Sequence, residues 1–380
     1  MADERELTNG TAEEKKLTNG TAEEKKLTNG TAGEKKLTNG TAGEEKLTNG
    51  TAGEKKLANG TAGEKKLTNG TMEEKTLTNG TTPAPRIVTN TYKGIAFPPL
   101  MKPEIIEGVQ SMKFHSDDII IVTSPKSGTH WMVETVGLLL ADGVWENVRR
   151  ASMKHHMEGG MCNKDTLKSS SPIRPFYREL EKMDSPRVMT SHLPLHLLPP
   201  GIFEAKAKVI YLARNPKDVM TSFFKFVALT PQSEFFTWDR VLKNIFTDKN
   251  SYGAWDKHVL SYWRVKHLEN IMFLKFEDMK TKQRACVASI AKFINHPVSG
   301  DVLDDVISKT SIEGIRKEMA RLEETLEDGN QYGKAYGTVS YYRKGIIGDW
   351  KNCFTVAQSE QFDRELQERL HGSGLTFDFE

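Results

Sequence analysis

The chain has 380 residues, enough for one large domain or two ordinary ones. Basic and acidic residues nearly balance, with a formal net charge of +2, which argues against a nucleic-acid-binding surface spread over the whole chain. The three cysteines form no disulfide framework and no C-x-x-C metal pattern, and no stretch is apolar over the roughly eighteen residues of a membrane helix. With a polar N-terminus unlike a secretory signal, the sequence predicts a soluble cytoplasmic protein that binds neither nucleic acid nor a membrane.

The first eighty residues are repetitive. Residues 1–80 consist of ten-residue blocks that vary on LTNGTAEEKK. Each block has one dependable leucine, which is too little apolar surface to bury a core. A threonine followed three residues later by glutamate fits a helix-capping box, but isolated helices this short are marginal in water, and known solenoid repeats are longer. We predict a mostly disordered low-complexity tail over residues 1–85 and a folded domain over residues 86–380.

The remainder has the pattern of an α/β protein. We expect strands at 119–122, 208–212 and 271–276, and helices at 129–140, from 215 onward, at 255–267 and at 360–370. Short apolar strands that alternate with helices favour a mainly parallel sheet covered on both faces. The prediction is one α/β domain with a central, mainly parallel sheet flanked by helices.

The segment 123–131, TSPKSGTHW, follows the first of these strands and precedes a helix. Such a junction points backbone N–H groups and the positive end of a helix dipole at one place, which makes an anion site. Gly128 lets a ligand approach closely, Lys126 adds a positive charge, and Trp131 can stack on a nucleobase. In a P-loop the lysine follows a glycine and precedes the hydroxyl residue that holds magnesium, whereas here Lys126 precedes Ser127. The loop is therefore P-loop-like but does not have the P-loop order.

A second junction, RNPKD at 214–218, follows the second strand. Asn215 is a suitable N-cap, so Arg214 stands at the carboxyl end of a strand, where open α/β sheets bind ligands. A magnesium-dependent P-loop enzyme usually has an acidic residue in such a place. Arginine instead predicts a metal-free site for a second anionic group, to which the hydroxyl of Ser222 can contribute. Two anion sites suit a nucleotide that is phosphorylated at two places.

Two further segments carry candidate groups. Residues 340–345, SYYRKG, form a cationic loop that ends in glycine, and alone it reads as a solvated basic turn. His192 lies in the segment TSHLP, just before the second strand. The unperturbed pKa of histidine makes it a natural base for taking a proton from a hydroxyl, although most histidines fill surfaces or cores.

Taken together, these segments resemble the cytosolic sulfotransferases. That family uses 3′-phosphoadenosine 5′-phosphosulfate (PAPS) and releases adenosine 3′,5′-bisphosphate (PAP). Residues 123–131 match its 5′-phosphosulfate loop, T-Y-P-K-S-G-T-T-W, and residues 214–222 and 343–351 match its 3′-phosphate elements. The matches run in the family's order from about Tyr92 to Leu370 and leave the repeat tail outside. The resemblance implies a PAPS-dependent sulfotransferase that uses no metal and takes a small hydrophobic, hydroxylated acceptor.

The resemblance also implies roles for individual residues. His192 would be the catalytic base, and Lys126 would stabilise charge on the departing phosphate. The residues implied in PAPS binding are Lys126, Ser127, Gly128, Thr129, His130, Trp131, Arg214, Ser222, Phe276, Thr310, Ser311, Ile312, Ile315, Tyr341, Tyr342, Arg343, Lys344 and Gly345. The candidates for the acceptor side are Thr190, Ser191, His192, Phe97, Phe176, Phe226 and Tyr252. Ordinary core packing would explain each of these aromatic residues equally well. The family's dimer motif, K-x-x-x-T-V-x-x-x-E, implies a homodimer through Lys351, Thr355, Val356 and Glu360.

Four positions depart from the family's pattern. His130 replaces a threonine of the phosphosulfate loop, Phe276 replaces a tyrosine, and Ile312 replaces a phenylalanine. Thr190 replaces the lysine of phenol-type members, and the resulting TSHLP is close to the S-S-H-L-P of the hydroxysteroid-type branch. We expect an acceptor among hydrophobic alcohols, steroids or phenols.

Two other functions stay open on sequence grounds. A P-loop-type phosphotransferase is disfavoured because the Gly-Lys-Ser/Thr order and the acidic metal ligand are missing. A catalytically impaired nucleotide-binding or scaffold protein of the same fold is kept open by His130, Thr190 and Phe276.

Overall fold

In the computed structural model, the chain divides by its internal contacts into two units, Met1–Ala84 and Pro85–Glu380. The structure describes residues 5–12, 15–22, 25–32, 35–42, 45–52, 55–58, 65–68, 89–149, 155–161, 173–229, 233, 236–325 and 342–380.

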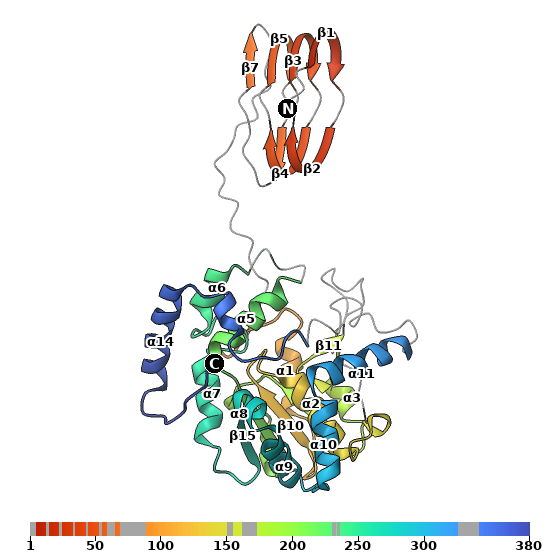
Figure 1. The fold of residues 1–380 in the computed structure, drawn as a ribbon, viewed down its shortest axis with the longest axis vertical. Coiled ribbons are helices and arrows are strands. Elements are labelled where there is room, and N and C mark those ends of the chain that lie inside the picture. The colour runs from red at the N-terminus through yellow and green to blue at the C-terminus, as the bar shows by residue number, and fades with distance from the viewer. Residues whose placement is uncertain are drawn as a thin grey trace. The chain divides into compact units, whose positions relative to one another are not determined.

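The first unit consists of short parallel strands where it is described (Figure 1). The strands are β1 (Arg5–Ala12), β2 (Lys15–Ala22), β3 (Lys25–Ala32), β4 (Lys35–Ala42), β5 (Glu45–Ala52), β6 (Lys55–Ala58) and β7 (Lys65–Thr68). Each of β1 to β5 pairs with the strand two blocks further on, so that Leu7 lies opposite Leu27. The blocks are strands here, not the helical turns that their capping pattern allows. This strand pairing needs matching registers but no apolar core. The expectation of a mostly disordered tail stays a prediction.

The second unit is built on a parallel sheet with the strand order β13–β10–β14–β15. These strands are β10 (Ile119–Thr123), β13 (Val188–Ser191), β14 (Lys208–Ala213) and β15 (Ile271–Lys275). Ile121 of β10 pairs with Thr190 on one side and with Ile210 on the other. The predicted central parallel sheet is therefore confirmed, and Figure 1 shows helices packed around it.

The helices and the short strands of this unit connect and cover the sheet. The helices are α1 (Pro103–Gln110), α2 (Thr129–Leu140), α3 (Tyr177–Leu180), α4 (Pro200–Glu204), α5 (Pro216–Val227), α6 (Trp238–Asn244), α7 (Trp255–Arg264), α8 (Phe276–Thr281), α9 (Gln283–Phe293), α10 (Gly300–Lys309), α11 (Ile312–Thr325) and α14 (Val356–Leu370). Two short antiparallel pairs are formed by β8 (Asn90–Tyr92) with β9 (Ile95–Phe97) and by β11 (Gly160–Met161) with β12 (Arg174–Pro175).

Side chains of the central strands alternate between two covered faces, as the period of a strand requires. Ile120 and Val122 of β10 belong to the core that includes residues of α1, α5, α7 and α14. Ile119 and Ile121 belong to a second core with residues of α2, α9 and α10. Since both faces are buried, β10 is apolar without interruption, which is the signal that made it recognisable in the sequence.

The edge strand β13 is the strand of the central sheet that sequence analysis missed. Its residues, VMTS, form no apolar run, although Met189, Thr190 and Ser191 are buried. Its start is held to β10 by a buried ion pair between Arg187 and Asp118. The third expected strand is one residue shorter than predicted, because Phe276 begins α8.

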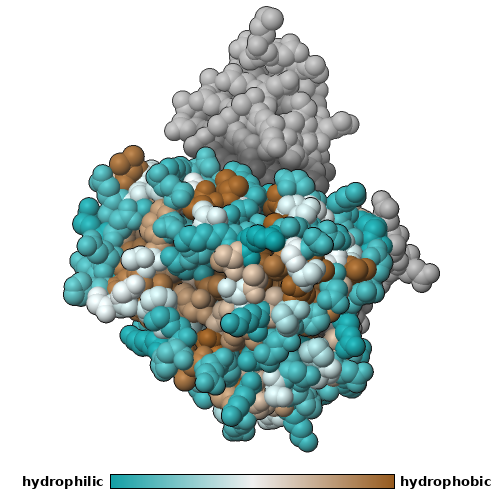
Figure 2. Space-filling view, turned by 60° about the horizontal axis from the view of Figure 1, so that its bottom comes forward, coloured by the Kyte–Doolittle hydropathy of each residue, from teal (hydrophilic) through white to brown (hydrophobic). Residues whose placement is uncertain are grey.

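Hydrophobic residues on the face drawn in Figure 2 lie among hydrophilic ones. Of the large hydrophobic side chains in the described part of the chain, Val356 is the most exposed, at 77%. None of the helices that the structure describes has both the length and the apolar character needed to cross a membrane.

Candidate active site

Three neighbouring parallel strands bring the candidate segments to one edge of the sheet. Strand β10 ends at Thr123, β13 ends at Ser191 and β14 ends at Ala213. The loop 124–128, His192 and Arg214 follow these strand ends directly. Because parallel strands share a direction, their carboxyl ends lie together, and this edge is where open α/β sheets bind ligands.

The loop before α2 has the backbone of an anion site. Gly128 is the N-cap of α2 and has a φ of 110°, in the left-handed region that favours glycine. A Cβ atom at this position would lie 3.0 Å from the ring of Phe276 and 3.1 Å from Leu212, so the loop also needs glycine for space. The Oγ atom of Ser127 is buried and has no hydrogen-bond partner among the described residues. A buried hydroxyl without a partner is costly, and a bound anion would supply one.

Three cations meet beside this loop: Lys126, Arg214 and Arg343, here called the cation cluster. Burial, followed by the charges of Arg343 and Arg214, lowers the pKa of Lys126 to about 7. Burial also lowers the pKa of Arg214, which Asp218 and Glu277 partly offset. Like charges held close together at a buried place favour an anionic ligand, which would relieve their repulsion.

Arg214 is fixed in position by protein contacts that leave part of its guanidinium free to bind. One terminal nitrogen donates to the carbonyl oxygen of Ile346 at 2.7 Å and lies 3.4 Å from Asp218. The guanidinium also lies over the ring of Phe276, 4.2 Å from its centroid. The Nε atom is buried without a hydrogen-bond partner among the described residues. Like Ser127, Arg214 therefore has unused capacity for an anion.

The loop formed by residues 342–348 contacts Arg214 through its backbone, at the carbonyl oxygen of Ile346. Asp349 accepts hydrogen bonds from Arg343 at 2.5 Å and from Lys344 at 2.6 Å. Burial acts to raise the pKa of Asp349, but the bonds to Lys344 and Arg343 outweigh it and lower the pKa to about 2. Gly345 has a positive φ of 63°. Tyr342 is buried, whereas Tyr341 lies outside the described residues.

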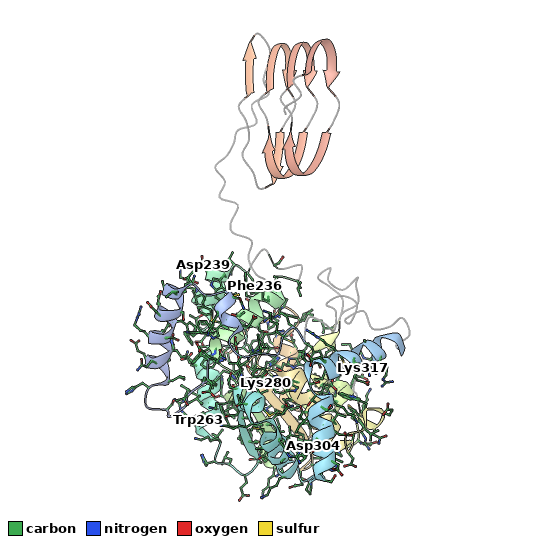
Figure 3. All side chains as sticks on the ribbon, in the orientation of Figure 1. Phe236, Asp239, Trp263, Lys280, Asp304 and Lys317 are labelled. Carbon is green, nitrogen blue, oxygen red and sulfur yellow. The ribbon has the colours of Figure 1, made fainter. Side chains whose placement is uncertain are left out.

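The residues expected on the adenine side gather around Trp131. Its indole N–H donates to the carbonyl oxygen of Thr310 at 3.0 Å, and its ring meets that of Phe276 edge-on at 5.2 Å. Lys280, labelled in Figure 3, has its Nζ 5.5 Å from the centroid of the same indole. The remaining predicted residues lie as follows: Ile315 is buried, Ser311 accepts from the backbone N–H of Gly314, and Ile312, Ser222 and His130 are at least partly exposed.

His192 is anchored to the end of β10. Its Nδ1 atom lies 2.8 Å from the carbonyl oxygen of Thr123, which can only accept a hydrogen bond. In the neutral ring, Nδ1 therefore carries the proton and Nε2 has the free lone pair. The hydroxyl of Thr123 lies 3.1 Å from Nδ1 and 2.7 Å from the hydroxyl of Thr129. Thr123 thus links the imidazole directly to the anion-binding loop.

Burial, followed by the charge of His156, lowers the pKa of His192 to about 3, while Glu158 acts in the opposite direction. An imidazole with so low a pKa is unprotonated at neutral pH and is able to accept a proton. The backbone N–H of His192 donates to Glu158 at 2.6 Å. Sequence analysis identified neither His156 nor Glu158, because their segment has no periodic pattern or motif.

The aromatic residues predicted for the acceptor differ in their relation to His192. Tyr252 meets the imidazole edge-on with ring centroids 5.3 Å apart, and Phe97 packs on Tyr252 from the core, also at 5.3 Å. Phe226 lies beneath Lys126, whose Nζ is 3.9 Å from the ring centroid. Phe176 is held by a backbone hydrogen bond to Gly159. Thr190 and Ser191 are buried in β13. Tyr252 is therefore the aromatic residue that the structure places against the imidazole.

The predicted dimer segment lies at the start of α14. Thr355 is the N-cap of this helix and forms a capping box with Gln358. Val356 follows with its side chain exposed, and Glu360 is also exposed. Lys351 forms an ion pair with Glu380 at 2.8 Å. A large exposed valine on an ordered, capped helix is available for contact with another chain.

In the described portions of the chain, no group of three or more His, Cys, Asp or Glu residues is arranged to hold a metal ion.

Known proteins resemble this chain over the second unit. The family model of the sulfotransferase domain matches residues 116–374. Sulfotransferase 1A1 of Canis lupus familiaris is 34% identical over 291 residues, covering 75% of this chain and 94% of that protein. Sulfotransferase 2B1 of Rattus norvegicus is 35% identical over 288 residues, covering 74% and 79%.

Solved structures give the same picture. Mouse sulfotransferase SULT7A1, complexed with PAP, has a TM-score of 0.59 and 26% identity, with 75% of this chain and 96% of that one covered. Retinol dehydratase, in a complex with retinol and PAP, has a TM-score of 0.61 at 20% identity, with 75% and 89% covered, which shows a common fold.

Proposed function

The chain belongs to the cytosolic sulfotransferase family and is a PAPS-dependent sulfotransferase, and on that premise we propose that it sulfates a hydroxyl group of a small hydrophobic acceptor, with His192 as the general base. The observation that carries this proposal is the position of Thr123. Its carbonyl and hydroxyl hold His192, and the same hydroxyl contacts Thr129 at the start of α2. A base therefore lies two hydrogen bonds from the loop that would hold the group to be transferred.

The residues of this site fit PAPS. Two buried polar atoms, Oγ of Ser127 and Nε of Arg214, have no protein partner in the described chain, and both belong to segments expected to bind phosphate. We assign the 5′-phosphosulfate to the loop of Lys126, Ser127, Gly128 and Thr129. We assign the 3′-phosphate to Arg214, Ser222 and residues 343–345, and the adenine side to Trp131 and Phe276. Holding the donor at both ends would position it for reaction.

PAPS, when bound, supplies a sulfuryl group on a good phosphate leaving group. His192 would take the acceptor's hydroxyl proton on Nε2 while the acceptor oxygen forms its bond to sulfur. The bond between sulfur and the phosphate oxygen breaks, and PAP is released. Lys126 would stabilise the negative charge that develops on that oxygen, as preorganised charges do. The proton remains on His192 until it is lost to solvent.

The surroundings of His192 support a hydrophobic acceptor. Tyr252 places an aromatic ring beside the base, Phe97 packs behind that ring from the core, and Phe226 lies under Lys126. An apolar pocket with one hydroxyl-directed base suits alcohols, steroids or phenols. Thr190, which is smaller than lysine, adds no charge next to the base.

We further propose that the enzyme is a cytoplasmic homodimer and that residues 86–380 carry its activity. The exposed Val356 on the capped helix α14 supports the dimer. The contact division after Ala84 supports the separation of the tail, which has too little apolar surface to add to the site.

The test is a turnover assay of the full chain with PAPS against phenols, primary amines and 3-hydroxysteroids, with and without EDTA. Sulfated phenol or steroid, formed equally well in EDTA, is the expected result. Strict magnesium dependence would favour the phosphotransferase. If PAP binds and no acceptor in the panel is sulfated, the chain is instead an impaired, nucleotide-binding member of the family.

A further inference from the structure

A second histidine lies against the proposed base. The rings of His156 and His192 have centroids 4.7 Å apart and planes inclined at 54°. Backbone pairing holds His156 in this position. His156 forms a parallel β-bridge with Thr190, and the backbone N–H of Met157 donates to the carbonyl oxygen of Thr190 at 2.9 Å. Since Thr190 belongs to β13 and His192 follows that strand, the sheet fixes the two rings relative to each other.

One carboxylate oxygen contacts both histidines. Oε1 of Glu158 accepts the backbone N–H of His192 at 2.6 Å and lies 3.3 Å from Nε2 of His156. Glu158 is fully buried, and burial raises its pKa despite the partners that lower it. A buried carboxyl group is tolerated only with hydrogen-bond partners, and the backbone N–H of His192 is one of them.

The ring of His156 also contacts two residues predicted for acceptor binding, Thr190 and Tyr252. Its Nδ1 lies 3.2 Å from the hydroxyl of Thr190, and its Nε2 lies 3.3 Å from the hydroxyl of Tyr252. The ionisable groups around the histidine pair are Glu158 and Lys126, which act on His192, and Tyr252, whose hydroxyl faces His156. His258 and His130 are also electrostatically coupled to His192, and Nε2 of His258 lies 3.0 Å from the carbonyl oxygen of His192. His192 itself is held from the opposite side by Thr123.

We propose that His156 is a positioning residue for the sulfuryl transfer: together with Glu158 it holds the imidazole of His192 in its reactive orientation and disfavours protonation of that imidazole. This inference deepens the proposed function and rests on His192 being the base. Two imidazoles this close cannot both carry a charge at low cost, so their titrations are coupled. Burial lowers the pKa of His156 to about 4, against about 3 for His192. A charge on either imidazole therefore disfavours protonation of the other, which helps to keep His192 neutral until it takes the acceptor's proton.

Two substitutions separate the two parts of this role. His156→Phe keeps an aromatic side chain of similar size but removes both the hydrogen bonds and the charge. His156→Gln keeps an amide that can bond to Thr190 and Glu158 but cannot titrate. His267→Gln, at an exposed position, is the matched control.

The experiment measures kcat, the KM for acceptor and the Kd for PAP in the full-length chain from pH 2.5 to 8, a range that contains the acid limb expected near the lowered pKa of His192. We expect kcat of His156→Phe to fall roughly 10- to 100-fold with the Kd for PAP unchanged, because a slightly misplaced base is costly. We expect His156→Gln to keep kcat within about fivefold. In both variants the acid limb of kcat should move to higher pH by roughly one unit, because the coupling is lost. Histidine NMR titration of the same variants should show the raised pKa of His192 directly.

Several results would overturn the proposal. A wild-type kcat and acid limb in His156→Phe would do so, as would a His156→Gln variant that loses kcat like His156→Phe without any move of the acid limb. If His156→Phe fails to bind PAP because it is misfolded, the acid limb of His156→Gln decides. A fully active His192→Asn variant would instead show that the proposed base is wrong. If His192→Asn is inactive while both His156 variants match the wild type, only the present inference fails.

Discussion

The Nδ1 atom of His192 lies 2.8 Å from the main-chain carbonyl oxygen of Thr123, the last residue of the central strand β10. This contact sets the tautomer of the ring, because a carbonyl oxygen accepts only from a protonated nitrogen. It therefore directs the unprotonated Nε2 away from the sheet end as a base. The loop expected to hold the donor begins at the same strand end. The end of β10 therefore sets the positions of both the base and the donor.

The pH dependence of turnover follows from the burial of His192. Burial first, and the charge of His156 second, lower its pKa to about 3, so the neutral form needed for catalysis persists as pH falls below 6.5. We expect no acid limb between pH 5.5 and 7.5 in the kcat of the wild-type chain with saturating PAPS. A limb centred near pH 6.5, the value of a solvated histidine, would contradict the burial argument.

PAP binding should weaken as pH rises through the pKa of Lys126. Burial and the charges of Arg343 and Arg214 lower that pKa to about 7, so Lys126 is charged below this value and neutral above it. A bound anion favours the charged form, and affinity should fall between pH 7 and 9, by up to about tenfold per unit. Calorimetry in buffers of different ionisation enthalpy should detect proton uptake on binding. Lys126→Met should flatten this dependence, and a wild-type affinity that is constant over the range would refute it.

Arg214 should contribute strongly to PAP affinity. Its buried Nε has no protein partner in the described chain, and its other contacts hold it in place. Hydrogen bonds to charged groups contribute about 1.5–3 kcal/mol, so Arg214→Met should raise the Kd for PAP by roughly 10- to 150-fold. Arg264→Met, at an exposed position on α7, is the control and should leave the Kd unchanged. Equal Kd values for both variants would remove Arg214 from the phosphate site.

The dimer prediction depends on Val356. Its side chain is 77% exposed at the first turn of α14, next to the N-cap Thr355. Val356→Glu places a charge at this position and should convert a dimer into monomers. Leu268→Glu, at another exposed hydrophobic position, should not. Size-exclusion chromatography with light scattering gives the mass of each variant in solution. The segment has no role in assembly if the wild type is monomeric or if Val356→Glu stays dimeric.

The part of the fold that the sequence predicts is the part with uninterrupted burial. Strands β10 and β14 are apolar because both faces of the sheet are covered, and α2 and α7 have clear helical spacing. Strand β13 was missed because its short segment mixes Met189 with Thr190 and Ser191, which are buried at the sheet edge without an apolar pattern.

The candidate site also has residues that the sequence predicts and residues that it does not. The anion-binding loop and Arg214 were found because each follows a predicted strand and because their chemistry is local in sequence. His156 and Glu158 could not be found, since the backbone pairing that brings His156 to Thr190 joins residues 34 positions apart. The pairing of Asp349 with Arg343 and Lys344 was also unforeseen, because it needs the turn at Gly345 and Gly348.

The most direct test of the central claim is the activity of His192→Asn. Asparagine places an amide N–H where Nδ1 donates to Thr123 and removes Nε2, so the anchor is kept while the base is lost. With PAPS and an acceptor that the wild type sulfates, kcat should fall by about 10²- to 10⁴-fold, while the melting temperature and the Kd for PAP stay those of the wild type. Turnover at the wild-type rate in this variant would contradict the assignment of His192 as the base.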